Sequence, residues 1–224
     1  MANHRTALWR ARVVTSATRG LRSFCVALLL SALAMSSAAA QQASRRSNPE
    51  PALRTGSILV FGGAFSKGNL QESLTPFVAH ERNYLVGIAY ARDFVGLGWG
   101  FNLGGEIGYA ARFGEDRGSS EVWAGPALRH RGFPIGNLLT LSPGLVLGFS
   151  AVTAPIGIES DREIKHGGSA GVLFRFSPEL ALRFNTWKNF ELVYRVHHRS
   201  GLYGVIGDLK EGSNAHVIGL RWYR

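Results

Sequence analysis

The sequence is almost without cysteine. Its one cysteine, Cys25, lies among the first forty residues, so the rest of the chain can form no disulfide and has no thiolate nucleophile. That remainder must be stabilised by strand pairing and packing rather than by covalent cross-links.

Long apolar runs are also missing. The most apolar stretch, which begins at Phe24, falls short of the ~20 residues that a membrane-spanning helix needs and ends in Ala38, Ala39 and Ala40. Five arginines and no acidic residue precede it. A basic start, a short apolar centre and small residues at the exit are typical of a secretory signal. We therefore expect residues 1–40 to be a signal peptide and residues 41–56 to be a flexible polar lead.

The excess of positive charge is smaller than the whole chain suggests. Of its 25 basic residues five lie in residues 1–40, where there is no acid, which leaves 20 basic against 15 acidic residues and a net charge of +5. A charge of this size gives little support to a nucleic-acid partner, and none is expected.

After residue 57 the apolar residues lack the 3.6-residue period of a helix and instead alternate, which is typical of strands. In one run Val172, Phe174 and Phe176 fall on one face, whereas Arg175 and Glu179 fall on the other. Eight such runs are predicted, at residues 57–66, 83–93, 97–112, 120–131, 137–152, 169–184, 189–200 and 214–223. The glycines within them suit curved strands, and no helix is expected.

The connections between these runs alternate in length. Residues 67–82, 113–119, 153–168 and 201–213 form long connections, whereas 94–96, 132–136 and 185–188 form short ones. Short periplasmic turns and long outer loops are typical of a bacterial outer-membrane barrel. We predict that residues 57–224 form an all-β, eight-stranded antiparallel transmembrane β-barrel in the outer membrane, with both chain ends in the periplasm.

A soluble eight-stranded barrel is the competing interpretation, because it would bury the apolar face and hydrate the polar one. The length of several runs and the even strand count favour the membrane barrel. In that case charges of both signs would pair inside a narrow lumen. These charges belong to Glu106, Glu121, Arg129, Arg175, Glu179, Glu191 and Arg195.

The candidate chemistry lies at the end of the seventh run. Counting by twos from Phe190 places His198 and Ser200 on the apolar, lipid-facing side, next to the outer loop at 201–213. Residues i and i+2 of a strand are ~7 Å apart at their Cα atoms, so a histidine there could take the proton of a serine hydroxyl. A histidine and serine at a membrane rim could also simply bond head groups or water. His197 has the opposite parity and is expected to be an internal hydrogen-bonding residue.

The segment His197-His198-Arg199-Ser200-Gly201, followed by Tyr203-Gly204 and by Gly212-Ser213-Asn214, resembles the C-terminal signature of the lipid A 3-O-deacylase family of PagL-like outer-membrane barrels. The motif covers about the last thirty-five residues. The resemblance implies a serine esterase that removes the 3-hydroxyacyl chain of lipid A, with Ser200 as nucleophile, His198 as base and the Gly201 N–H as oxyanion donor.

The third member of the site departs from the family pattern. The family places an acid about a dozen residues after the serine, and Glu211 comes near that position. Asp208 lies roughly where the family has an oxyanion asparagine, but an ionised carboxylate cannot donate. Asn214 is the alternative donor if the loop is gapped, in which case Asp208 could be the orienting acid.

Metal and cofactor sites have little support. His80, Glu81 and His130 lack further ligands at metal spacing, and a serine esterase needs no cofactor. The basic residues Arg162 and Lys165 lie in an outer loop that could touch lipid A phosphates or simply be solvated. The expected partners are lipopolysaccharide and outer-membrane lipids, with a homodimer left open. A phospholipid hydrolase and a non-catalytic structural or adhesive barrel remain the alternatives.

Overall fold

The structure is a computed structural model that describes residues 56–115 and 118–224. The expected signal peptide and all but the last residue of the expected lead lie outside these residues. The described elements are β1 (Ser57–Ser66), η1 (Glu72–Leu74), β2 (His80–Gly98), β3 (Phe101–Gly114), β4 (Ser119–His130), β5 (Phe133–Ile135), β6 (Leu139–Val152), α2 (Ile158–His166), β7 (Val172–Phe184), β8 (Phe190–Ser200) and β9 (Asn214–Tyr223).

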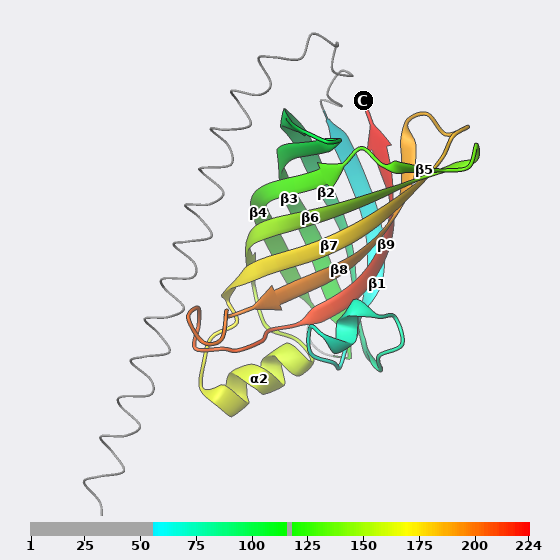
Figure 1. The fold of residues 1–224 in the computed structure, drawn as a ribbon. Coiled ribbons are helices and arrows are strands. Elements are labelled where there is room, and N and C mark those ends of the chain that lie inside the picture. The colour runs from blue at the N-terminus through cyan, green and yellow to red at the C-terminus, as the bar shows by residue number, and fades with distance from the viewer. Residues whose placement is uncertain (1–55, 116–117) are drawn as a thin grey trace, which may run out of the picture. The chain divides into compact units, whose positions relative to one another are not determined.

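The strands form one closed antiparallel barrel (Figure 1). Apart from β4 and β5, strands that are consecutive in sequence pair with each other. β1 also pairs with β9, and β4 pairs with β6, which completes the ring. The short β5 continues β4 after a break at Arg131 and Gly132 and pairs with the same strand, β6. The barrel therefore has eight strands, as the alternating pattern predicts. Closure gives each of the eight long strands in the described residues a partner on both sides.

Long and short connections lie at opposite ends of the barrel. Figure 1 shows η1, α2 and the β8–β9 loop together at one end, and the C-terminus with β5 at the other. The predicted long connections are confirmed at 67–79, 153–171 and 201–213. The predicted long connection at 113–119 is wrong, because β3 continues to Gly114 and β4 begins at Ser119.

The predicted turn at residues 94–96 is wrong, because β2 continues to Gly98. Gly98 pairs with Phe101 across a two-residue turn, in which Trp99 and Gly100 have φ values of 52° and 85°. Positive φ at both central residues is the conformation that matches the twist of a hairpin, and glycine adopts it without strain. The glycines at 98 and 100, rather than the glycine at 96, mark the turn.

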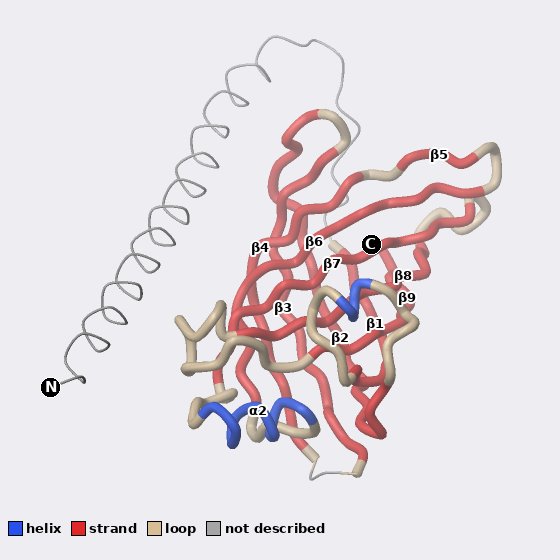
Figure 2. Tube along the Cα trace, turned by 60° about the horizontal axis from the view of Figure 1, so that its bottom comes forward, coloured by secondary structure: helices blue, strands red, loops and turns tan. Residues whose placement is uncertain are grey.

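The expectation of no helix is also wrong. The described residues include η1 and, in the β6–β7 connection, the longer α2, which is labelled and drawn in blue in Figure 2. Its first turn carries Glu159 and Asp161, its last turn carries Lys165 and His166, and Gly167 ends it at φ 64°. Acids at the start and bases at the end complement the helix dipole, and a left-handed glycine ends helices commonly. A helix of only nine residues is too short to show a clear apolar period. No helix in residues 56–115 and 118–224 is long and apolar enough to cross a membrane.

The outward face of the barrel is apolar. Ile107, Phe149 and Ile218 point outward with 62%, 57% and 59% of their surface exposed. The interior contains many polar and charged residues, together with a buried apolar cluster that includes Phe61 and Trp123. A soluble barrel would instead present polar residues on this outer face. The expected assignment of faces is therefore confirmed.

The interior also contains two clusters of charges. In the cluster towards the short turns, Glu179 accepts hydrogen bonds from Arg129 Nε at 2.7 Å, Arg195 Nη2 at 2.5 Å and Arg221 Nη2 at 2.6 Å. Arg195 also donates two bonds of 2.8 Å to the two oxygens of Glu106. These side chains are almost completely buried, so each arginine depends on a carboxylate for its partner.

The second cluster lies towards the long loops. Glu159 of α2 is fully buried and accepts hydrogen bonds from Arg199 and, at 2.8 Å, from Arg112 Nη2. Glu121 lies 3.5 Å from Arg175 Nη1 and 3.9 Å from Arg112 Nε. The α-helix thus contributes a carboxylate to the interior and is held on the end of the barrel by charge.

We expect Glu179→Gln to destabilise the barrel by about 3–5 kcal/mol, because it removes the carboxylate that three buried arginines share and leaves buried positive charge in excess. The matched control is Glu115→Gln, which removes an exposed ion pair with Arg82, whose atoms are 3.2 Å apart, and should cost at most about 1 kcal/mol. Denaturant unfolding of the refolded protein in micelles measures both. Equal losses for the two variants would contradict a structural role of the interior network.

Candidate active site

The candidate nucleophile and base lie side by side on the outward face of β8. His198 pairs in register with Asn214 of β9 and Phe176 of β7, and Ser200, the last residue of β8, pairs with Phe174. The predicted parity of β8 is confirmed. Both side chains are nevertheless covered, with 3% of His198 and 7% of Ser200 exposed.

The partner of the His198 imidazole is Asn214. The Nδ1 atom of His198 lies 2.6 Å from Oδ1 of Asn214. The Nδ2 atom of the same amide donates to the carbonyl oxygen of Gly68 at 3.0 Å. Because a carbonyl can only accept, Gly68 fixes which end of the amide faces His198. His198 Nδ1 therefore carries the proton, and Nε2 keeps the lone pair that a base needs.

Glu211 does not occupy the orienting position. Its carboxylate Oε2 lies 3.3 Å from Nη2 of Arg162, whereas His198 Nδ1 is already bonded to Asn214. The structure thus separates Glu211 from the pair that it was expected to join. An asparagine can orient a catalytic histidine, as in papain-like proteases, because an amide oxygen accepts the Nδ1 proton without carrying a charge.

The two residues considered as oxyanion donors or as the alternative acid are also placed differently. The Nδ2 group of Asn214 is used by Gly68, so this residue serves His198 rather than an oxyanion. Asp208 is exposed and has a left-handed φ of 53° in the β8–β9 loop. Aspartate tolerates that conformation better than most residues, which is a structural reason for its presence.

Gly201 allows the β8–β9 loop to fold closely onto itself. A Cβ atom there would lie 2.0 Å from the carbonyl oxygen of Leu209 and 2.3 Å from that of Ile206. Its own carbonyl accepts the Ile206 N–H at 2.8 Å. This close approach accounts for a glycine at position 201, while its N–H as an oxyanion donor stays a prediction.

His197 points into the barrel, as its parity predicts. It is fully buried, and its Nε2 atom lies 2.8 Å from Oε1 of Glu121 and 2.7 Å from Nη1 of Arg175. Its ring packs edge-on against Trp123 with centroids 5.3 Å apart. The residue belongs to the interior charge cluster and is not on the face that carries Ser200.

Sequence reasoning missed the contributions of Gly68 and Arg162. Gly68 acts through its backbone carbonyl. Every residue has such a group, so the residue type does not indicate this role. Arg162 donates from Nη1 to the Gly212 carbonyl at 2.7 Å, and its Nη2 lies 3.4 Å from the Gly68 carbonyl. It was noted only as part of a basic loop, because nothing in the sequence shows that this loop folds back over the end of β9.

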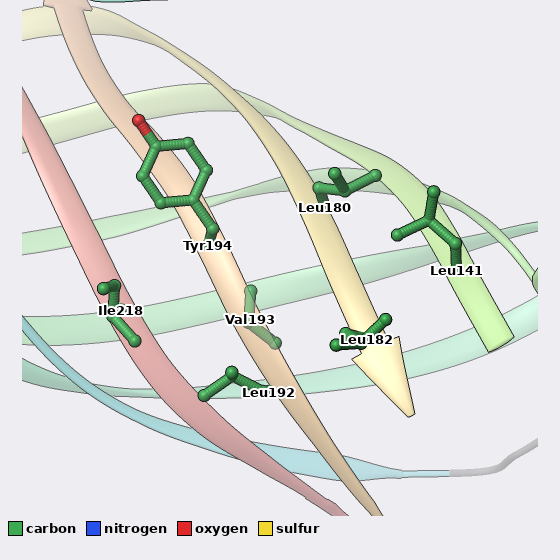
Figure 3. A pocket seen from close by; sticks show the side chains of 7 residues that line it. All are labelled: Leu141, Leu180, Leu182, Leu192, Val193, Tyr194 and Ile218. Atoms are coloured by element: carbon green, nitrogen blue, oxygen red, sulfur yellow. The ribbon is translucent and has the colours of Figure 1, made fainter. Parts of the chain in front are cut away.

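A shallow apolar groove of about 230 Å³ lies further along the outward face of the same strands (Figure 3). It begins at Tyr194, four residues before His198 on the same face of β8. The groove is lined by Leu141, Leu180, Leu182, Leu192, Val193, Tyr194 and Ile218. An apolar chain lying along the strands from Ser200 would run towards it.

Comparison with solved structures shows the fold. The barrel is similar to the crystal structure of the outer membrane enzyme PagL, with a TM-score of 0.52 and 14% identity over 74% of this chain and 98% of that one. The crystal structure of Neisserial surface protein A has a TM-score of 0.48 and 10% identity, over 78% of this chain and 100% of that one. The N-terminal β-barrel domain of Pseudomonas aeruginosa OprF has a TM-score of 0.42 and 12% identity, over 77% of this chain and 98% of that one. No protein-family model matches the chain. No curated protein matches it. The chain therefore has the fold of the small outer-membrane barrels.

We expect Gly201→Ala to disrupt the β8–β9 loop, because the added methyl group would collide with two backbone carbonyls. Limited trypsin digestion measures this effect, since Lys210 lies exposed in the same loop. Cleavage after Lys210 should become faster than in the unaltered protein. Gly171→Ala is the control, because a Cβ atom there meets only Ser169 Oγ at 3.5 Å. Equal cleavage rates in both variants would show that Gly201 is not needed for loop packing.

Proposed function

We propose that this protein is an outer-membrane serine esterase that hydrolyses an ester-linked acyl chain of lipid A. The observation that carries the proposal is the oriented His198 imidazole, held through Nδ1 by Asn214, with Ser200 two residues further along the same outward face. The sequence resemblance to the lipid A 3-O-deacylase family at residues 197–214 supports the same assignment.

The location of the site supports a lipid substrate. The face that carries Ser200 and His198 is otherwise apolar, and in an outer-membrane barrel such a face contacts lipid. Ser200 stands at the end of β8 that leads into the long loop, which corresponds to the outer surface of the membrane. Lipid A lies in that outer leaflet, so its ester would lie at the same membrane depth as the serine.

The proposed chemistry follows the roles of a serine–histidine pair. His198 Nε2 takes the proton of the Ser200 hydroxyl as its oxygen attacks the ester carbonyl, and the Gly201 N–H is the nearest backbone donor to the resulting oxyanion. When the intermediate collapses, the sugar oxygen leaves with the proton held by His198. Water then attacks the acyl-enzyme with the same base, which releases the fatty acid and restores Ser200.

The apolar groove supports an acyl substrate. An acyl chain bonded to Ser200 and lying along β7 and β8 would pass Phe174 and Phe176 before it reaches the groove at Leu180 and Tyr194. The acyl chain of a membrane lipid is already surrounded by hydrocarbon, so the groove would align the chain along the strands rather than draw it out of water. The proposal therefore favours esters of membrane lipids over short soluble esters.

Lipid A incubated with the refolded protein in detergent should lose one hydroxyacyl group, as measured by mass spectrometry. Ser200→Ala and His198→Ala should abolish this loss, because they remove the nucleophile and the base. Asp208→Asn, which changes an exposed charge of the same loop, is the matched control and should remain active. If lipid A is untouched while phospholipid releases fatty acid, the esterase site stands but its substrate is a phospholipid. If neither lipid is cleaved by a folded barrel, the proposal is wrong.

Asn214→Ala should lower kcat by on the order of 10²- to 10⁴-fold, because the histidine loses the group that fixes its tautomer. Glu211→Gln should cost much less, since its carboxylate contacts Arg162 rather than His198. Steady-state kinetics with the same lipid substrate compares the two variants. A larger loss for Glu211→Gln than for Asn214→Ala would identify Glu211 as the orienting acid instead.

A further inference from the structure

Arg162 of α2 bridges the two chain segments that surround Asn214. Its Nη1 atom donates to the carbonyl oxygen of Gly212, two residues before Asn214, at 2.7 Å. Its Nη2 atom lies 3.4 Å from the carbonyl oxygen of Gly68, which also accepts the Asn214 amide. The guanidinium side chain is only 16% exposed, so these contacts are largely shielded from water.

Both carbonyls stand in tightly packed backbone. A Cβ atom at Gly68 would lie 2.7 Å from Val78 Cγ2, and one at Gly212 would lie 2.5 Å from Leu173 Cδ1. The β1–β2 loop that contains Gly68 is also closed by the Lys67 N–H, which donates to the Ala79 carbonyl at 2.8 Å. The carbonyls therefore occupy defined positions, and Arg162 joins one to the other.

The helix that carries Arg162 is itself fixed on the barrel. One turn before Arg162, the buried Glu159 accepts hydrogen bonds from Arg112, Arg199 and the hydroxyl of Ser213. One residue after it, Glu163 Oε1 accepts the Ala170 N–H at 3.2 Å. Since Ser213 adjoins Asn214, α2 holds this end of β9 from both the interior and the loop side.

We infer that Arg162 is a positioning residue for the esterase site, acting through Gly68 and Asn214 on the tautomer of His198. The effect of Arg162 on catalysis rests on the proposed function. Its effect on the His198 tautomer does not depend on whether the protein is an esterase. With Gly68 in place, Oδ1 of Asn214 faces His198. If the Gly68 carbonyl moves away, the amide can turn and present Nδ2, which stabilises the His198 tautomer whose Nε2 carries the proton and cannot act as a base.

An arginine suits this task better than a lysine. Its planar fork presents two donors in a fixed relation, so it can hold two carbonyls at once, whereas an ammonium group is a single point of charge on a flexible stem. Arg162→Lys should keep the attraction to Glu211 but lose one of the two carbonyl contacts. The His198 tautomer of Arg162→Lys is therefore expected to lie between those of the unaltered protein and of Arg162→Ala.

The experiment that tests the inference measures the tautomer of His198 by NMR. Protein labelled with ¹⁵N at histidine is refolded in detergent micelles, and the His198 signals are assigned by their loss in His198→Gln. The unaltered protein should show the proton on Nδ1. Arg162→Ala should shift the population towards the proton on Nε2, and Arg162→Lys should give a smaller shift. Lys165→Ala, an exposed position on the same helix, is the matched control and should show no shift.

A second comparison separates positioning from folding. A carboxylate has two acceptor oxygens and no donor. In the Asn214→Asp variant the side chain therefore accepts the hydrogen bond from His198 Nδ1 whichever way it is turned. Adding Asn214→Asp to Arg162→Ala should therefore restore the Nδ1-protonated form. If Arg162→Ala acted only by unfolding the loop, the second substitution would not restore it. An unchanged tautomer in a folded Arg162→Ala protein would overturn the inference.

Kinetics gives the catalytic consequence. Arg162→Ala should lower kcat by up to about 100-fold with little change in KM, because the substrate is bound elsewhere and only the base is affected. A shift of the tautomer in a protein that cleaves no lipid would support the positioning role and reject the esterase. Normal cleavage in Arg162→Ala with an unshifted tautomer would reject the positioning role and leave the esterase intact.

Discussion

The pairing of buried charges inside the barrel is the interaction on which the rest of the structure depends. Every second residue of each strand points into a narrow space, where arginines and glutamates must satisfy one another beside a buried apolar cluster. Glu179 alone accepts hydrogen bonds from three arginines that belong to three different strands. The bonds from Arg129 of β4 and Arg221 of β9 reach to β7, which is not the sheet neighbour of either strand. They therefore add to the backbone ladder in fixing the strand registers.

The same interior network holds the candidate active site in place. Arg199 lies between His198 and Ser200 in sequence and points inward, where Glu159 and Ser150 accept its hydrogen bonds. The backbone that carries both outward side chains is therefore anchored from the opposite face. A site on the end of a strand, supported in this way, is more rigid than one on a loop, which suits a serine and a histidine that must keep their relative geometry.

The orienting role of Asn214 follows from its surroundings. An uncharged amide is cheaper to bury than an ionised carboxylate, and Asn214 is fully buried. An amide has two unlike ends, however, so it works only if something fixes its orientation. The carbonyl of Gly68 fixes the orientation by accepting the Nδ2 hydrogen bond of Asn214, and Arg162 of α2 contacts the same carbonyl. The asparagine beside His198 thus depends on α2, because Arg162 of that helix contacts the carbonyl that orients its amide.

The sequence by itself determined the barrel, its eight strands, the face of each strand and the positions of His198, Ser200 and His197, because alternation with a period of two is a local property. It could not determine the partner of His198. That partner depends on how β8 and β9 pair across the thirteen residues 201–213, and no local rule sets the register of so long a loop. The contribution of Gly68 was equally hidden, since it comes from a backbone atom 146 residues away from Asn214. Only the closed barrel, which brings the β1–β2 loop and α2 to the end of β9, decided which groups surround the base.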